Sequence, residues 1–277
     1  MVVNRLSSLW QRLFLRIMLK VFKYTVSDLT RSRWTYGYFL FYLVMTLGLL
    51  YFSNDLSKAI ISMMNIILLL NPLIATLSGT LYFYHSREFA ELLLALPLKR
   101  TSVFIGKYLG LSFSLAISYF LGTGIPFLIY GIQMTGQAGN FFMLTVAGLF
   151  LTFIFTGLSF LVSLRFENTI RGFGISIFIW LFLAIVYDGF FLLTLLIFEQ
   201  YPLDKYSLIV TLFNPIDLSR VLIMLKLDIS ALMGYTGAVF NKFLGTGLGM
   251  TVALGSLLLW NLLPLLVFFR QVKRKDF

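Results

Sequence analysis

Six long apolar stretches divide this chain, and its basic residues gather in every second gap between them. Of its 22 Lys and Arg, 17 lie before the first stretch, after the last one, or in the second and fourth gaps. The acidic residues do not alternate, so one side is strongly basic and the other neutral. Lys and Arg concentrate in the short cytoplasmic connections of membrane helices. The pattern therefore predicts a multi-pass membrane protein with both termini in the cytoplasm.

Each apolar stretch is long enough to form a membrane helix. A helix needs roughly 20 residues to cross about 30 Å of hydrocarbon, and its amides bond to one another inside lipid. The predicted fold is all-α, with one membrane domain over residues 1–277. Spans are expected at 35–52, 59–84, 108–132, 141–164, 173–198 and 246–269, with a cytoplasmic loop at 85–107 and an outer loop at 199–245.

The composition agrees with a membrane domain and excludes several kinds of site. Apolar residues make up 59% of the 277 residues, and charged residues only 12%. With no Cys and only His85 as a histidine, the chain has neither a disulfide framework nor thiolate metal ligands. The net charge of +11 suits anionic lipid headgroups, and no nucleic-acid partner is expected.

The first 34 residues predict an amphipathic helix at the membrane surface. Apolar residues recur at three- and four-residue steps from Leu6 to Val21, while Arg12, Arg16 and Lys20 occupy another face. A basic helix of this kind suits the inner leaflet. It is either an elbow that leads into the first span or a docking site for a cytosolic partner.

The cytoplasmic loop 85–107 is too long for a turn and carries both signs of charge. It predicts a short helix with an apolar side, which Pro97 ends, and charged side chains that remain available to another surface. An ordinary basic loop would have a similar composition. The expected apolar side consists of Phe89, Leu92, Leu93 and Leu96, and the expected charged residues are Arg87, Glu88 and Glu91.

Two segments resemble the ABC-2 type permeases, the six-span membrane subunits of ABC exporters. They are SREFAELLLALPLKRTSVFIGKYLG at 86–110 and KYTVSDLTRSRW at 23–34. The resemblance implies a homodimer in the bacterial cytoplasmic (inner) membrane, with cytosolic ATPase subunits that press on a coupling helix in the loop. It assigns ATPase coupling to Arg87, Glu88, Glu91, Leu92, Leu93 and Pro97.

The chain carries no motif for binding ATP. Its only Gly-Lys pair, Gly106-Lys107, lacks a Gly five residues earlier and is followed by Tyr108 instead of Ser or Thr. We therefore expect no catalytic residue and no cofactor in this chain, with ATP and Mg bound to a separate ATPase. Gly106 and Gly110 are small residues four apart, which predicts a close helix contact or a dimer seam.

The outer loop 199–245 predicts two short helices at the outer interface, at 216–227 and 229–240. The string NPIDLSRVLIMLKLDISALMGYTGAVF at 214–240 resembles the branch of the family that serves nitrous oxide reductase maturation. This resemblance implies a periplasmic repeat protein as partner and copper as a candidate cargo. It assigns contact with that partner to Asn214, Pro215, Asp217, Arg220 and Asp228.

Polar residues are rare inside the spans. Asp188 is the one carboxylate deep in a span, and such a group must face protein or water. Asn65 lies at a similar depth and is its expected partner, either in a structural hydrogen bond or in a conducting path. Seven of the ten Met fall on the outer side, where thioethers either bind Cu(I) or fill helix contacts.

The sequence leaves four functions to compare. A transporter subunit is favoured, and an intramembrane enzyme is not, because the spans hold neither a nucleophile with a nearby base nor paired acids. A mechanical relay that changes a periplasmic protein without moving a solute is the main alternative. An exporter permease of another branch, for drugs, lipids or polysaccharides, is the other.

Overall fold

The computed structural model describes residues 2–53, 56–95, 98–130, 138–198, 200, 204–227, 243 and 247–274, and every regular element in these ranges is a helix. Six helical runs in this part of the chain are long and apolar enough to cross a membrane. The predicted all-α, six-span fold is confirmed. The spans are α2 (Arg33–Phe52), α3 (Leu56–His85), α5 (Arg100–Ile129), α6 (Ala138–Arg165), the run of α7 (Thr169–Leu181), η1 (Phe182–Val186) and α8 (Tyr187–Ile197), and α12 (Gly247–Arg274).

Four further helices whose bounds fall in the described residues lie outside these spans. They are α1 (Val2–Thr30), α4 (Arg87–Leu94), α9 (Asp204–Leu212) and α10 (Pro215–Lys226). The predicted N-terminal and loop helices are therefore confirmed as α1 and α4, and the helix expected at 216–227 as α10. The helix expected at 229–240 lies outside the described residues. Helix α9 was not predicted, because Asp204 and Lys205 at its start indicate a loop.

The third span starts earlier than the sequence indicates. Helix α5 begins at Arg100, whereas the predicted span begins at residue 108. The prediction was late because the first two turns of α5 carry basic residues, which indicate a loop. Lys107 is nevertheless only 2% exposed. Its ammonium group donates to the carbonyl oxygen of Ser86 at the end of α3, at 2.6 Å.

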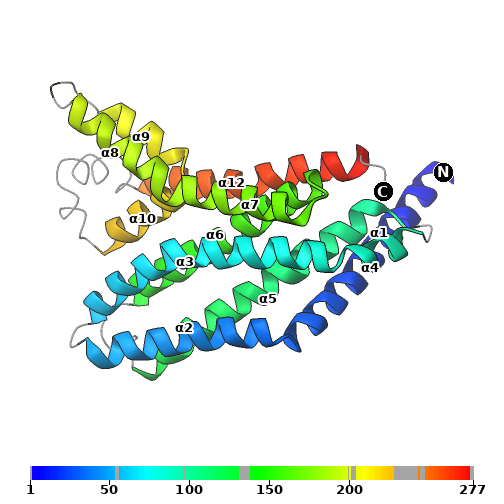
Figure 1. Ribbon diagram of the computed structural model, residues 1–277, viewed down its shortest axis with the longest axis horizontal. Coiled ribbons are helices and arrows are strands. Elements are labelled where there is room, and N and C mark those ends of the chain that lie inside the picture. Colours follow the sequence, from blue (N-terminus) through cyan, green and yellow to red (C-terminus); the bar gives the residue numbers. More distant parts are fainter. Residues whose placement is uncertain are drawn as a thin grey trace.

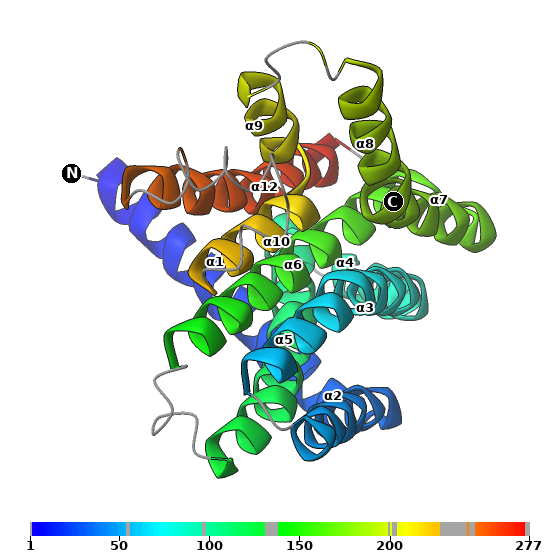
Figure 2. The same ribbon diagram turned by 90° about the vertical axis from the view of Figure 1, so that its left-hand side faces the viewer.

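The spans form one bundle, with α3 and α6 side by side at its centre (Figure 1). Viewed along the bundle, α5 lies beside this pair and α2 lies outside α5, while α7 and α12 cover other sides of the pair (Figure 2). Helix α1 lies against α5 at the end of the bundle that holds α4. There, Gly106 and Gly110 leave room for Val21 and Thr25 of α1. The predicted close contact of these two glycines is thus made within the chain.

A buried polar centre joins α2, α3 and α6 halfway along the bundle. The side-chain amide of Asn71 donates to the carbonyl oxygen of Gly148 at 2.7 Å and to Oγ1 of Thr152 at 3.1 Å. The hydroxyl of Tyr38 donates to the other end of the same amide. Asn71 is fully buried. Its hydrogen bonds tie three spans together where no water is present to replace them.

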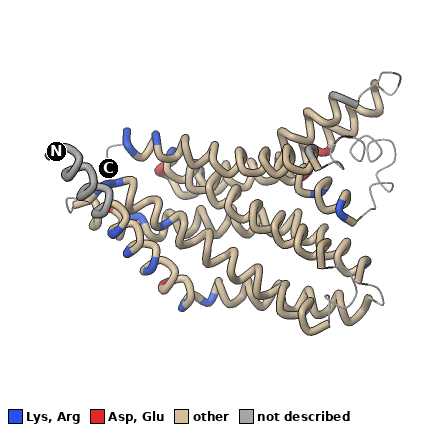
Figure 3. The backbone as a smooth tube through the Cα atoms, turned by 180° about the vertical axis from the view of Figure 1, so that it is seen from behind, with Lys and Arg blue, Asp and Glu red and all other residues tan. Residues whose placement is uncertain are grey.

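The two ends of the bundle differ in their number of charged residues. Figure 3 shows that basic residues gather at the end that holds α4 and the last turns of α12, with a smaller basic group on α10 at the other end. We call these the α4 end and the α10 end.

The α10 end contains two departures from straight helices. Span five passes through the π-helical turn η1, and the chain bends by 114° between α9 and α10. Trp260 of α12 donates its indole N–H to the carbonyl oxygen of Leu212, the last residue of α9, at 3.1 Å. A polar group freed at the bend is thereby satisfied by a neighbouring span.

Candidate functional site

Helix α4 presents charged and apolar side chains outwards at its end of the bundle. Only Ala90 is buried among its residues, where the helix packs on α3 and α5. Leu92 is 71% exposed and Phe89 is 37% exposed. Leu92 is therefore uncovered within the chain, whereas Phe89 is partly covered by the ring of Tyr24 on α1, with 5.0 Å between the ring centres. An exposed apolar pair on a short helix at the end of a bundle is a surface suited to contact with another protein.

The charged residues predicted for α4 flank this apolar pair. Arg87 and Glu91 form an ion pair one helical turn apart, with 2.9 Å between Nε and Oε1. Glu88 and Glu91 are exposed, and Leu93 is half-buried. The predicted coupling residues from Arg87 to Leu93 thus share one short helix, while Leu96 and Pro97 lie outside the described residues.

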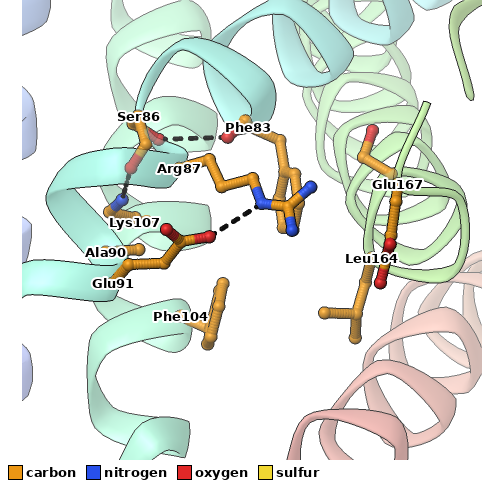
Figure 4. Close-up of a pocket in the computed structure, with 10 residues that line it drawn as sticks. Phe83, Ser86, Arg87, Ala90, Glu91, Phe104, Lys107, Leu164 and Glu167 are labelled. Carbon is orange, nitrogen blue, oxygen red and sulfur yellow. Dashed lines mark hydrogen bonds and ion pairs between the residues drawn. The ribbon is translucent and has the colours of Figure 1, made fainter. Parts of the chain in front are cut away.

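Lys107 fixes α4 to the bundle. Its ammonium group bonds to the Ser86 carbonyl oxygen, at the turn between α3 and α4 (Figure 4). The same group lies 5.5 Å from the centre of the Phe89 ring. The aromatic face attracts the cation, so one buried charge holds both the start and the first turn of α4. Because Lys107 belongs to α5, this contact links α4 directly to the third span.

A cavity opens beside α4, and both apolar and charged side chains line it (Figure 4). Ser163 of α6 lines it with a buried hydroxyl that has no hydrogen-bond partner among the described residues. Apolar side chains share the remaining wall with two carboxylates and two basic groups. Its lining consists of Phe83, Ser86, Arg87, Ala90, Glu91, Phe104, Lys107, Ser163, Leu164 and Glu167.

Lys107→Met should loosen α4 without unfolding the bundle. Methionine keeps the apolar length of the side chain but cannot donate to the Ser86 carbonyl. We expect the amides of α4 to exchange about tenfold faster, because a hydrogen bond from a charged donor contributes about 1.5 kcal/mol. Hydrogen exchange read by mass spectrometry measures this. Lys58→Met, which removes an exposed lysine on α3, is the control, and equal α4 exchange in both variants would contradict the expected role of Lys107.

At the α10 end, Asn214 organises the bend between α9 and α10. Its Oδ1 accepts from the backbone N–H of Ile216 at 3.1 Å, which caps α10. Its Nδ2 donates to Oδ2 of Asp217 at 2.7 Å and to the carbonyl oxygen of Leu183 at 2.8 Å. Pro215 takes the first position of the helix, where a missing N–H has no cost.

Arg220 of α10 lies between two carboxylates. Its Nη1 is 2.8 Å from Oδ2 of Asp188 on span five and 3.2 Å from Oδ1 of Asp217 on α10 itself. Of the residues predicted to contact a periplasmic protein, Asn214, Asp217 and Arg220 thus bond to one another or to span five, and Pro215 starts α10. Contact with a partner stays a prediction for them, and Asp228 lies outside the described residues.

The predicted pairing of Asp188 with Asn65 is wrong. The ion partner of Asp188 is Arg220, and the side chain of Asn65 is exposed on α3. The physical reason is that a carboxylate in a span gains more from a cation than from a neutral amide, and the bend between α9 and α10 brings one within reach.

Several residues that organise the structure were missed from the sequence. The burial of Asn71 could have been predicted from helical spacing, because Asn71 lies four residues after Ile67 and seven after Met64 and so shares their face of α3. The π-turn has no recognisable signal in the sequence.

Of the outer-side methionines, Met63, Met64 and Met143 are buried in the core, which favours packing over copper binding for these three. Met134 and Met233 lie outside the described residues.

Comparison with known proteins covers most of the chain. A protein-family model described as "ABC-2 family transporter protein" matches residues 52–277, which include α4 and α10. "Probable ABC transporter permease protein NosY" of Pseudomonas aeruginosa is 26% identical over 226 residues, covering 76% of this chain and 82% of that protein. The protein of the same name from Stutzerimonas stutzeri is 24% identical over 269 residues, covering 90% of this chain and 95% of that protein.

Proposed function

The chain belongs to the ABC-2 family of transporter proteins and is the permease component of an ABC transporter, and on this premise we propose that α4 is the helix on which a separate ATPase acts. The observation that carries the proposal is the exposure of Phe89 and Leu92 between the charged groups of α4. Since the sequence contains no phosphate-binding loop, the energy must come from another polypeptide. We propose a homodimer of this chain with two ATPase subunits.

Joint purification tests this assembly. The full chain, expressed with the ATPase encoded beside it and extracted in a mild detergent, should co-purify with that ATPase in equal amounts. Recovery of the chain alone, from membranes that contain both proteins, would contradict the proposal and favour a scaffold. The size of the complex in the same experiment distinguishes two copies of this chain from one.

We place the α4 end in the cytoplasm and the α10 end on the outer side. The support is the concentration of basic residues at the α4 end (Figure 3). Because the chain has no native cysteine, a single introduced one is the only target for a thiol reagent. Leu92→Cys should react with a membrane-impermeant maleimide only after cells are permeabilised, and Lys226→Cys should react in intact cells. The opposite pattern would reverse the orientation.

The system in which this permease works is proposed to be the maturation of the copper sites of nitrous oxide reductase, together with a periplasmic repeat protein. The names of the two relatives support this, as does the segment from Asn214 that forms α10. Deletion of the gene should then leave nitrous oxide reductase with less copper per polypeptide, and restoration of the gene should recover it. Full copper loading in the deletion strain would move the chain to another branch of exporters.

A relay without solute transport is the second proposed function. It is favoured by the hydrogen bonds that join the α10 end to spans five and six, since these offer a mechanical route to a protein on the outer side. Reconstituted vesicles separate the two functions. A transporter moves copper species across the bilayer when ATP is added, whereas a relay changes only the conformation of the α10 end.

A further inference from the structure

The π-turn of span five changes the partner of one backbone carbonyl. In a regular α-helix, the N–H of Tyr187 would donate to the carbonyl oxygen of Leu183, four residues earlier. Here it donates to Phe182, five residues earlier. The Leu183 carbonyl accepts instead from Nδ2 of Asn214 at 2.8 Å. The side chain that caps α10 thus occupies the acceptor that the π-turn leaves.

Two more contacts reach the same short part of span five from the bent pair α9–α10. The hydroxyl of Tyr187 donates to the carbonyl oxygen of Val210 on α9 at 2.7 Å. Arg220 of α10 bonds to Asp188, the next residue along α8. Three contacts to neighbouring positions therefore fix both the height and the rotation of α8 relative to the bend.

Little else in the described part of the chain holds α8. None of its residues is buried, whereas α5 and α6 are buried over much of their lengths. In both views, α8 and α9 project together beyond the rest of the bundle (Figures 1 and 2). The orientation of α8 thus depends on its contacts with the bent pair.

We propose that Arg220 and Asn214 are positioning residues that hold the second half of span five in register with the bent pair α9–α10, so that these helices move as one unit. The alternative register, a regular α-helix through span five, differs from the observed one by a single residue. If the Tyr187 N–H returned to the Leu183 carbonyl, α8 would turn by about 100° relative to α7 and move by about 1.5 Å along its axis. Asp188 would then leave Arg220. The two side chains favour the π-turn by bonding only to the register that contains it.

The test is a distance measurement on the permease alone, in lipid nanodiscs. Because the chain has no native cysteine, spin labels attach only at introduced ones. Leu196→Cys on α8 and Lys226→Cys on α10 are exposed positions on the two sides of the proposed connection. Pulsed electron resonance on the doubly labelled chain, diluted into an excess of unlabelled chain so that only distances within one chain are measured, should give one narrow distance distribution for this parent. Addition of Arg220→Gln or Asn214→Leu should broaden it or add a second population.

Two controls separate positioning from general damage. Arg220→Lys keeps the charge and should restore most of the parent distribution. Thr194→Val removes a hydrogen bond that stays within α8, from Oγ1 to the Phe190 carbonyl, and should leave the distribution unchanged. If Arg220→Gln does not yield a monodisperse protein, Asp188→Asn removes the same ion pair from the side of span five.

Narrow, parent-like distributions in Asn214→Leu and in the variant without the ion pair would overturn the proposal, and so would equal broadening in Thr194→Val. The measurement needs neither an ATPase nor a cargo. Its outcome therefore does not depend on the function proposed above.

Discussion

Asn71→Leu should lower the free energy of unfolding by about 2 kcal/mol. Hydrogen bonds between membrane helices contribute on average about 0.6 kcal/mol each, and the Asn71 amide makes bonds to Tyr38, Gly148 and Thr152. Leucine has the same branched shape but is larger, and it leaves the Tyr38 hydroxyl without its acceptor, which adds the cost of an unpaired polar group, while Thr152 still donates to the Gly148 carbonyl. Reversible unfolding in mixed detergent micelles measures the difference.

The matched control lies on the same helix. Asn65→Leu makes the same chemical change at an exposed position of α3. We expect the unfolding free energy of this variant to equal or exceed that of the unmodified chain, because an exposed amide in a span gains nothing from burial and leucine suits lipid. Equal losses in the two variants would show that the polar centre on Asn71 does not stabilise the bundle.

Leu92→Asp should prevent the ATPase from binding while the permease remains folded. The side chain is 71% exposed in the chain, so the substitution costs the fold little. In a complex, a carboxylate would be buried among apolar atoms of the partner, and removal of a central apolar contact weakens binding by about 2 kcal/mol or more. We expect at least a 30-fold loss of affinity for the ATPase, measured by titration of the purified subunits.

An acidic residue at the same end of the bundle controls for charge alone. Ser27→Asp on α1 places a carboxylate at an exposed position outside α4. We expect ATPase binding in this variant to stay within about twofold of the parent. Loss of binding in Ser27→Asp, or normal binding in Leu92→Asp, would remove α4 from the proposed interface.

The architecture could be predicted because hydrophobic length and charge bias are local properties of the sequence. Each span must cover the same thickness, so the six apolar stretches correspond to the six spans of the structure. The predicted bounds of a span were wrong where its helix continues past the apolar stretch, as α5 does. Lys107 predicts a loop, yet a backbone carbonyl and an aromatic ring accommodate its charge within α5.

The polar partners could not be predicted because they depend on contacts between distant segments. Arg220 looks like an outer-surface residue in the sequence, and only the bend at Asn214 brings it to Asp188. The choice between Asn65 and Asn71 shows the same limit. The two lie six residues apart and therefore on different faces of α3, and only packing against α6 decides which face is buried.

Because Trp260 donates a hydrogen bond to the Leu212 carbonyl, its fluorescence reports on the bend between α9 and α10. Indole emission shifts to longer wavelength when the ring passes from apolar surroundings into water. Opening of this contact would therefore change the intrinsic fluorescence of the chain. With Trp10, Trp34 and Trp180 replaced by phenylalanine, the remaining indole becomes an optical reporter of the α10 end that needs no attached dye.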